Sequence, residues 1–357
     1  MGRKNRSAVL ESQSPMLPED IHQHRAKFRS QRDRLELRSS RTLEALHSIY
    51  DPAVAWHGPH PINGCIGPDA VVKRFWAPLI NAVPDLERYE DILLSGIWKD
   101  RLWMASTGHF SGIFMRPWLG IPANGKVVNI RYGEFCCWDS SKIVESYLIL
   151  DIPDLLRQVG LWPLAPALGS IERVPGPATH DGVPNSAQDS RESDVSLKLV
   201  EAMIAGLMRY DGKSLDSMEQ SKFWHPDFMW YGPAGIGTCR GQTDYRRVHQ
   251  GPFLGAFPDR VGGDHKCRMA EGRYVASTGW PSIRATHRGS GFLGLTATSQ
   301  KVTMRVMDFW RRDEQLLREN WVFVDLLDLM KQMGLDVFER MRASGVLIET
   351  HDGGLAL

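Results

Sequence analysis

The stretch VVNIRYGEFCCW, residues 127–138, is the most informative about the fold, because a second strand-like run, KIVESYLIL at residues 142–150, follows it after the short polar segment DSS. Both runs are rich in β-branched and aromatic residues, which are typical of strands. A two-residue turn between them would bring the runs together as an antiparallel hairpin. The sequence therefore predicts a long β-hairpin at this point.

This hairpin has a twin later in the chain. KVTMRVMDFWRR at residues 301–312 and LLRENWVFV at residues 316–324 lie 174 residues further on, again separated by a short polar segment. The same offset relates WHGPHPINGC at residues 56–65 to WYGPAGIGTC at residues 230–239. Self-similarity at a fixed offset indicates a duplicated structural unit. We interpret the chain as two copies of one domain.

The duplication sets the domain boundaries. We predict a first domain over 19–163 and a second domain over 194–345. The segment 164–193 is rich in Pro, Gly, Ser and Asp and is interpreted as a linker. Residues 1–18 and 346–357 are expected to be tails.

Each copy begins with helical material and continues with strands. Leu, Ile and Met recur at helical intervals over 19–48 and 194–223, ahead of the strand-like runs. Helices followed by a meander of strands indicate an α+β fold, in which helices pack on one face of a curved antiparallel sheet. Such a domain would be a cone-shaped α+β barrel whose cavity suits a small apolar ligand.

Composition excludes several classes of function. Lys plus Arg (43) balances Asp plus Glu (42), so charge gives no reason to expect a nucleic-acid or membrane partner. The sequence has no apolar run long enough to span a bilayer. Five cysteines without a CxxC pair favour reduced thiols and a cytoplasmic location. We find no phosphate loop, dinucleotide motif or nucleophile elbow, and we expect no cofactor.

Two acids on apolar strand faces are the main catalytic candidates. Strand alternation places Glu134, and its twin Asp308, among apolar residues. With a turn at Ser140-Ser141, Glu134 would lie opposite Tyr147, and Asp308 would lie opposite Trp321. An apolar, aromatic wall raises a carboxyl pKa and suits general acid–base catalysis. The alternative is an acid that stabilises the hairpin through an ion pair, and recurrence is compatible with both.

Charged residues elsewhere have simpler interpretations. Arg131 and Glu145 recur as Arg305 and Glu319, and we interpret each set as a cross-strand charge pair on the sheet. The basic run over 25–41 is interpreted as a solvated helix face rather than a binding arm.

Histidines distinguish the two copies. His57, His60 and His109 are particular to the first copy, and His249, His265 and His287 to the second. His109 and His287 both follow an ASTG segment and are expected at comparable depths. Histidine titrates near neutrality and can act as a base or proton shuttle, although a lone histidine is more often structural.

The pair in WHGPHPINGC could also suggest a metal site. His57 and His60 flank a Gly-Pro and lack the third converging ligand that a metal site needs. Their counterparts are Tyr231 and Ala234, which excludes a metal site common to both copies. We predict no metal site and interpret both histidines as a local elaboration of the first cavity.

The order of motifs resembles that of the SnoaL-like polyketide cyclases, or ester cyclases, of the nuclear-transport-factor-two-like superfamily. WxGP is followed by PD, by R-x-x-[DE]-F, by E-x-[WY] and by D-x-x-D-L-x-x-Q-x-G-L, over nearly the whole chain apart from its tails and linker. The resemblance implies a cone-shaped α+β barrel. It also implies an acid on the late strand that catalyses a cofactor-free aldol closure, at Asp308 and Glu134. The superfamily includes non-catalytic binders as well.

These observations lead to a functional hypothesis. The chain is expected to be a lyase- or isomerase-type acid–base enzyme without a cofactor, acting on a small apolar carbonyl or aromatic compound by aldol or retro-aldol chemistry, cyclisation, dehydration or isomerisation. It would act as an internal pseudo-dimer, with a homodimer as a further option. The alternative is a ligand-binding or scaffold protein without turnover. The candidate catalytic residues are Glu134, Asp308, His57, His109 and His287. The candidate substrate-binding residues are His60, Trp56, Tyr132, Tyr147, Trp230, Tyr231, His249 and Trp321.

Overall fold

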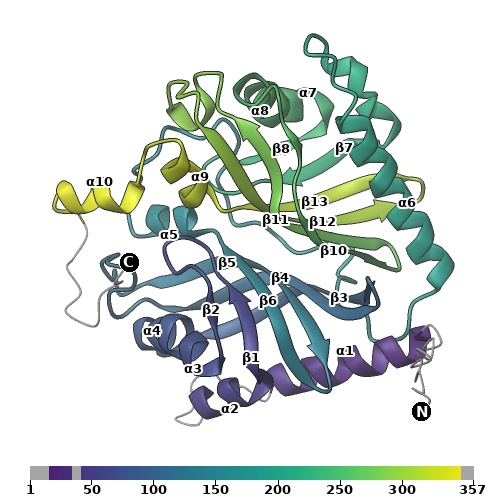
Figure 1. Cartoon of the computed structure of the whole chain (residues 1–357), viewed down its shortest axis with the longest axis vertical. Helices are drawn as coiled ribbons and strands as arrows, with labels where there is room; N and C mark the ends of the chain where they lie inside the picture. Colours follow the sequence, from purple (N-terminus) through teal and green to yellow (C-terminus); the bar gives the residue numbers. More distant parts are fainter. Residues whose placement is uncertain (1–15, 34–41, 347–357) are drawn as a thin grey trace, which may run out of the picture.

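The computed structural model of the chain describes residues 16–33 and 42–346 and shows two α+β halves (Figure 1). In each half a curved sheet carries helices on one face, and the two sheets face each other in the middle of the molecule. The tandem α+β architecture predicted from the duplication is confirmed. The predicted tails lie outside the described residues over 1–15 and 347–357.

The first half contains a sheet with strand order β2-β1-β6-β5-β4-β3, in which only β1 and β6 are parallel neighbours. Its elements are α1 (Pro18–Asp33), α2 (Thr42–Ile49), β1 (Tyr50–His57), β2 (Cys65–Ile66), α3 (Pro68–Val71), the π-helix η1 (Val72–Trp76), α4 (Ala77–Ala82), β3 (Glu87–Trp98), β4 (Arg101–Ile113), β5 (Val127–Asp139), β6 (Lys142–Leu150) and α5 (Ile152–Gln158).

The second half repeats this plan with strand order β10-β11-β12-β13-β7-β8, and β9 pairs with β11. Its elements are α6 (Ser190–Leu207), η2 (Leu215–Met218), η3 (Gln220–Lys222), β7 (Trp224–Tyr231), β8 (Thr238–Arg240), α7 (Gly241–Tyr245), the π-helix η4 (Arg246–Gln250), α8 (Gly251–Ala256), β9 (Val261–Gly262), β10 (His265–Glu271), β11 (Tyr274–Thr286), η5 (Phe292–Gly294), β12 (Lys301–Asp313), β13 (Leu316–Val324), α9 (Leu326–Gln332) and α10 (Val337–Ala343).

The predicted hairpin forms, but its register differs from the expected one. Ser140 and Ser141 both have positive φ, 46° and 69°, as a tight two-residue turn requires. An irregularity in β6 then shifts the pairing by one residue, so that Glu134 lies opposite Leu148 and Phe135 lies opposite Tyr147. A one-residue slip moves every later side chain to the other face. Our prediction that Tyr147 faces Glu134 is therefore wrong.

The same correction applies to the second hairpin. Asp308 pairs with Val322, and Trp321 pairs with Phe309, after a register shift near Arg311. Trp321 consequently lies on the sheet face opposite to Asp308. Equal bulges in both copies show that the duplicated hairpins keep the same irregularity.

Each sheet has two buried faces with different partners. One face packs on its own helices, and the other packs on the opposite sheet. The face between the sheets is aromatic and apolar and includes Trp103, Phe135, Tyr147, Ile149, Met269, Met307, Phe309, Trp321 and Phe323. The two halves thus share one continuous apolar contact, and hydrophobic burial is the main force that joins them.

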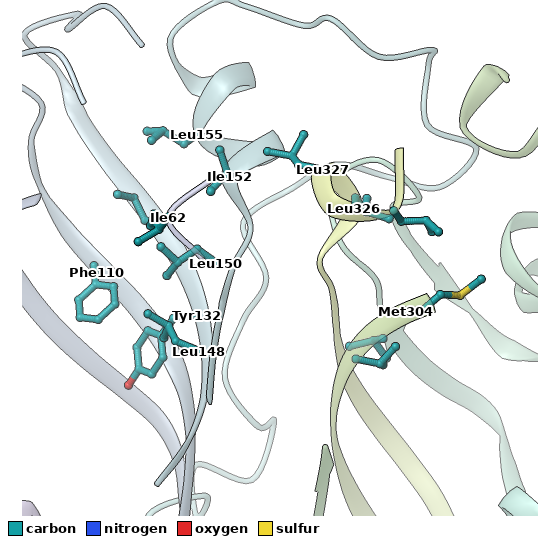
Figure 2. Packing of buried hydrophobic residues seen from close by; sticks show 14 of the residues in the cluster. Ile62, Phe110, Tyr132, Leu148, Leu150, Ile152, Leu155, Met304, Leu326 and Leu327 are labelled. Atoms are coloured by element: carbon teal, nitrogen blue, oxygen red, sulfur yellow. The ribbon is translucent and has the colours of Figure 1, made fainter. Parts of the chain in front are cut away.

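Two reciprocal hydrogen bonds lock the halves together. Oδ2 of Asp151 accepts from the backbone N–H of Ala234 at 3.0 Å, and Oδ2 of Asp325 accepts from that of His60 at 2.9 Å. Asp151 and Asp325 also cap the N-termini of α5 and α9. At this junction Leu327 of α9 extends toward Ile152 of α5 (Figure 2). The recurring D-x-x-D motif therefore serves both helix capping and domain pairing.

The recurring arginines have a different role from the one expected. Arg131 donates to the carbonyls of Tyr231 and Gly232 in the other half, at 3.0 Å each, and does not pair with Glu145. Glu145 instead forms an ion pair with Arg101 at 2.7 Å. Our cross-strand assignment of Arg131 and Glu145 is wrong, because Arg131 is used for contact between the halves.

The second-copy set departs from the expectation in the same way. Arg305 forms its ion pair with Asp325 at 2.9 Å, while Glu319 is paired with Arg311. The expected Arg305–Glu319 cross-strand pair is therefore also wrong. Each glutamate takes an arginine from its own sheet, and each recurring arginine lies at the junction of the halves.

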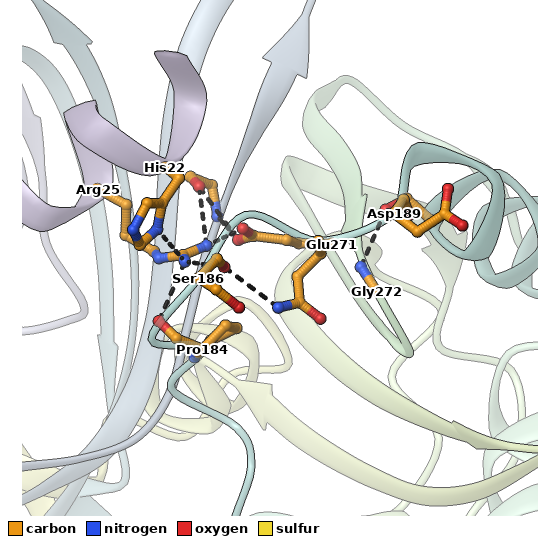
Figure 3. A network of polar contacts seen from close by, with 10 residues as sticks. His22, Arg25, Pro184, Ser186, Asp189, Glu271 and Gly272 are labelled. Carbon is orange, nitrogen blue, oxygen red and sulfur yellow. Dashed lines mark hydrogen bonds and ion pairs between the residues drawn. The ribbon is translucent and has the colours of Figure 1, made fainter. Parts of the chain in front are cut away.

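Helix α1 contributes a buried arginine, Arg25, to the contact between the halves (Figure 3). Arg25 forms an ion pair with Glu271 of β10 and donates to the carbonyls of Pro184 and Ser186 at 3.0 Å. Arg32 is also buried. The predicted solvated face therefore holds for Lys27 and Arg29, which are exposed, and is wrong for Arg25 and Arg32, which meet carboxylates in the interior. Residues 34–41 of the run lie outside the described residues.

The segment between α5 and α6 lies in contact with both halves. The indole N–H of Trp321 donates to the carbonyl of Pro175 at 2.8 Å. The backbone N–H of Leu93 donates to the carbonyl of Gly182 at 2.9 Å. Ser170 forms an isolated bridge with Thr238. These bonds fix the segment along the junction.

Candidate functional site

Both candidate acids lie on the helix-facing side of their sheets. Glu134 of β5 is 4% exposed, whereas Asp308 of β12 is partly exposed. Their strand neighbours on the opposite face, Phe135 and Phe309, belong to the core between the sheets. Strand alternation therefore located both acids on the helix-facing side.

In the first half the acid is neutralised by arginines. Oε2 of Glu134 lies 3.1 Å from the guanidinium of Arg32 and 3.1 Å from that of Arg88. Arg32 also pairs with Glu90 at 3.0 Å. Burial raises the pKa of Glu134, although Arg32 opposes this shift. The arrangement is that of a buried ion-pair network, in which the loss of one partner is costly.

Aromatic side chains fill the space around this network. The guanidinium of Arg88 lies over the rings of Tyr132 and Phe110, at 4.7 Å from each centroid. Trp56 is fully buried and stacks on Phe75 at 5.4 Å. Figure 2 shows Tyr132 and Phe110 side by side on this face. The two predicted ligand-binding aromatics, Trp56 and Tyr132, therefore pack against protein groups.

In the second half the acid has a different environment. Oδ1 of Asp308 accepts a hydrogen bond from the side-chain amide of Asn320 at 3.3 Å. Among the described residues, Asp308 forms no ion pair with a lysine or arginine. Burial raises the pKa of Asp308 to about 7, while Asn320 and the charge of Arg268 oppose the shift. A carboxyl with this pKa can accept and return a proton near neutral pH.

A row of polar residues crosses the sheet at Asp308. Ser277 of β11 pairs with Asp308 on one side and with Arg268 of β10 on the other. Paired residues share a face, so all three side chains lie on the helix side. Nε of Arg268 donates to Oγ of Ser277 at 3.4 Å.

Aromatic and imidazole rings lie on the same side of the second sheet. His249 of the π-helix η4 stacks on Trp230 at 4.4 Å, with the ring of Tyr245 at 5.5 Å. Burial lowers the pKa of His249 to about 3, so its imidazole is neutral at physiological pH. Its Nδ1 is buried without a hydrogen-bond partner. A neutral imidazole with an unsatisfied nitrogen can bind a polar group of a ligand.

His287 also lies in the second half, after the end of β11. Its Nδ1 lies 3.1 Å from Oγ1 of Thr298, and its ring lies 5.5 Å from that of Phe257. Nε2 of His287 is buried without a partner. Within the described residues we find no hydrogen bond or ion pair between His287 and Asp308.

The histidines expected near Glu134 lie elsewhere. His57 stacks on Tyr147 at 4.4 Å and approaches Trp280 of the second half at 6.1 Å. His60 approaches Phe338 of α10 at 6.4 Å. Both histidines lie at the junction of the halves, whereas Glu134 lies on the other face of its sheet. The structure therefore contradicts their placement in the first cavity.

His109 shares the junction side with them. It pairs with Arg131 across β4 and β5, and its Nδ1 lies 3.3 Å from a carboxylate oxygen of Asp91. His287 lies among apolar residues of the helix side instead. The comparable depth expected for His109 and His287 is wrong, because an irregularity after Gly279 separates the two ASTG contexts.

Two further candidates lie in the core between the sheets. Tyr231 stacks on Trp321 at 5.4 Å, and its hydroxyl lies 3.4 Å from Glu319. Together with Tyr147 they belong to the contact between the halves. The structure does not bring these three aromatics to either acid.

A pocket of about 100 Å³ opens at the same junction. His109, Arg131, Asp151 and Ala234 contribute to its lining, together with residues of the connecting segment. It lies on the side of the sheet away from Glu134, so it does not contain the candidate acid.

Two other properties of the described residues concern ligands and membranes. Histidine, cysteine, aspartate and glutamate side chains do not gather there into groups of three or more that could hold a metal ion. In the same part of the chain no helix is long and apolar enough to cross a membrane.

Sequence comparison agrees with the fold. A model of the SnoaL-like polyketide cyclase family matches residues 29–159 and 209–333, one match in each half. The chain belongs to this family. None of the curated proteins compared with this SnoaL-like chain matches it significantly.

Solved structures similar to this SnoaL-like protein match it over about two fifths of its length. An NTF2-like protein from Burkholderia xenovorans has 16% identity and a TM-score of 0.31, covering 40% of this chain and 97% of its own. TsrD from Streptomyces laurentii has 24% identity and a TM-score of 0.30, with coverages of 38% and 96%. A phenazine biosynthesis-related protein from Pseudomonas aeruginosa has 16% identity and a TM-score of 0.31, with coverages of 44% and 98%.

Sequence reasoning missed the residues that distinguish the two acids. Arg32 and Arg88 reach Glu134 from α1 and β3, far from it in sequence. Asn320 and Arg268 are particular to the second copy, where the first has Ser146 and Leu93 at the matching positions. Only the position of Asn320, on the same strand face as the acid and two residues from its partner, could have been noticed beforehand.

Proposed function

We propose that the second half of this SnoaL-like protein is a cofactor-independent acid–base catalyst and that Asp308 is its catalytic residue. The observation that carries the proposal is the contrast between the two acids. Glu134 is held by two arginines, whereas Asp308 has an amide as its contact and a pKa of about 7. A group poised near the working pH is the more effective proton acceptor.

The proposed step is removal of a proton from a carbon next to a carbonyl group. The carboxylate of Asp308 takes the proton, and the electron pair of the broken C–H bond delocalises onto the carbonyl oxygen as an enolate. Return of the proton to a different carbon of the conjugated system, or to the opposite face of the same carbon, gives isomerisation, and attack of the enolate carbon on a second carbonyl gives aldol closure. Elimination of water would give dehydration, and the reverse of the aldol step would give retro-aldol cleavage. No oxidant or reductant is needed.

Neighbouring residues would support this step. Asn320 is a positioning residue, because its amide holds Oδ1 of Asp308 and also donates to the carbonyl of Phe309 at 3.1 Å. Trp230 and His249 stack on each other in the interior on the same side of the sheet, and His249 also stacks on Phe253. This aromatic interior favours a largely apolar substrate.

The first half would then have a structural role. Its ion-paired acid and filled interior favour a partner domain that completes the junction, as one subunit of a dimer would. The chain would act as an internal pseudo-dimer with one catalytic half.

Hydrogen–deuterium exchange tests the assignment. Small aryl methyl ketones in D₂O are followed by NMR with the wild type, Asp308→Asn and Glu134→Gln. We expect Asp308→Asn to lose about 10²- to 10⁴-fold in exchange rate. Folded Glu134→Gln should retain the wild-type rate. Equal exchange by Asp308→Asn and the wild type would refute the role of Asp308, and binding of a ketone without exchange would favour the ligand-binding alternative.

A further inference from the structure

Arg268 lies on the same sheet face as Asp308, two strands away. Arg268 pairs with Ser277, and Ser277 pairs with Asp308, so the three residues form one cross-strand row. With strands spaced roughly 4.8 Å apart, the Cα atoms of Arg268 and Asp308 are separated by about 10 Å. Cys267 and Met269, the neighbours of Arg268, lie in the core between the sheets, which places Arg268 on the helix side.

The guanidinium of Arg268 is not neutralised. Within the described residues its only hydrogen bond is from Nε to Ser277, and it forms no ion pair. Burial lowers the pKa of Arg268, and the charges of Glu201 and Asp308 oppose this shift without contacting its guanidinium. A partly buried arginine without a contacting anion keeps its charge at a free-energy cost, unless a ligand supplies the counter-charge.

The first half lacks this arrangement. Leu93 occupies the position that matches Arg268, because it pairs with Ser106 as Arg268 pairs with Ser277. The arginines of the first half instead contact their acid directly. In the second half a cation and an acid lie on one sheet face with a small hydroxyl side chain between them.

We propose that Arg268 binds a carboxylate group of the substrate, so that the site takes carboxylate-bearing carbonyl compounds. The inference rests on the proposed function of Asp308 and adds the chemical class of the substrate. The planar guanidinium would hold the carboxylate through two parallel hydrogen bonds. The carbon that loses its proton would then lie over Ser277 and beside Asp308.

The same arrangement assists the proton transfer. When Asp308 takes the proton, its negative charge passes to the enolate of the substrate. The positive charge of Arg268 lies close enough to stabilise the resulting dianion. A carboxylate on Arg268 also shields Asp308 from this charge, which would raise the pKa of Asp308 and strengthen it as a base.

Matched acids and esters test the anchor. The probes are para-acetylbenzoate, an acetylnaphthoate and an acetylphenylpropanoate, each with its methyl ester, titrated calorimetrically at pH 6 into the full-length protein. We expect at least one acid to bind roughly tenfold or more tightly than its ester, as a bidentate charged contact allows. A panel in which no acid binds better than its ester overturns the proposal.

Variants identify the residue responsible. Arg268→Gln should abolish the preference for the acid, and Arg268→Lys should reduce it, because a lysine offers a charge without the planar pair of donors. Arg284→Gln removes an exposed arginine from the same half and should leave the preference intact. Melting curves check that each variant is folded. Persistence of the acid preference in Arg268→Gln overturns the proposal. If Arg268→Gln does not fold, an undiminished acid preference in Arg268→Lys overturns it instead.

The acetyl group of each probe distinguishes this proposal from that of Asp308. Exchange of the acetyl protons in D₂O reports on Asp308, whereas the acid-to-ester affinity ratio reports on Arg268. Asp308→Asn should retain the affinity ratio and lose exchange. Preference without exchange in the wild type would refute catalysis by Asp308 and leave the anchor standing, and exchange without preference would refute the anchor alone.

Discussion

The carboxylate of Glu134 lies 3.1 Å from the guanidinium of Arg32, which reaches it from α1, a helix that begins at Pro18. The equivalent acid of the second half, Asp308, has Asn320 at 3.3 Å in place of an arginine. One duplicated position therefore carries two kinds of carboxyl group. The first belongs to an ion-pair network, and the second is the group for which we propose proton transfer.

Glu134→Gln should destabilise the protein strongly. The substitution leaves Arg32 and Arg88 buried beside a neutral amide, and breaking a buried ion pair typically costs about 3 to 5 kcal/mol. Chemical denaturation measures the free energy of unfolding. Asp308→Asn is the matched control at the equivalent position and should cost much less, since Asn320 can still donate to the new amide oxygen. Equal losses in both variants would contradict the difference between the sites.

Proton exchange should depend on pH through Asp308. The pKa of Asp308 is raised to about 7, and only its ionised form is a base. The exchange rate should therefore rise as pH passes through about 7 and level off above it. Asp308→Glu should move this transition, and Asp308→Asn should remove it. A rate that is constant from pH 5 to pH 9 would argue against Asp308 as the base.

The pH dependence of stability should differ between two helix caps. Burial raises the pKa of Asp151, the cap of α5, to about 7. The pKa of Asp336, the cap of α10, is lowered because the backbone N–H of Glu339 and the side chain of Lys331 donate hydrogen bonds to its carboxylate. A raised pKa means that the folded state binds more protons than the unfolded state, so Asp151 lowers stability as pH rises from about 4 through 7. For Asp336 the sign is opposite, and its contribution is lost only as pH falls below its ordinary pKa.

Asparagine substitutions measure this difference. Asp151→Asn should become less destabilising between pH 5 and pH 8, by roughly 2 to 3 kcal/mol. Asp336→Asn should be destabilising to the same extent at both pH values. Thermal melting at the two pH values is the measurement. A pH-independent effect of Asp151→Asn would show that its carboxyl is ionised throughout this range.

The Arg25–Glu271 pair offers a test of how α1 is attached. Glu271→Met leaves Arg25 buried without its counter-ion and should cost about 3 to 5 kcal/mol. The double variant Arg25→Met/Glu271→Met removes both charges and should recover much of this loss. Additive losses in the double-mutant cycle would mean that the two side chains do not interact.

Much of the architecture could be predicted from residue patterns. The fixed offset between the copies gave two domains, and strand alternation placed Glu134 and Asp308 on the helix side of their sheets. Strand alternation depends only on neighbouring residues, and a repeat is found by comparing the sequence with itself, so neither requires the folded structure. The turn at Ser140 and Ser141 was also predictable, because tight turns have strong local requirements.

The aromatic partners of the acids could not be predicted in the same way. A single irregular residue in β6 moved Tyr147 to the other face, and an equivalent irregularity moved Trp321. Bulges depend on contacts across the sheet and leave little trace in one strand. The histidines of WHGPHPINGC were misplaced for a related reason, since His57 and His60 contact the second half of the chain.

Residue patterns alone established the duplication, the α+β class and the position of one acid on each sheet. The difference between the two acids depends on contacts that exist only in the folded chain. Arg32 and Arg88 contact Glu134 from elements that are distant in sequence. Arg268 lies two strands away from Asp308, with Ser277 on the strand between them. The pKa of a carboxyl depends on burial and on charges within a few ångströms, and these are properties of the folded chain.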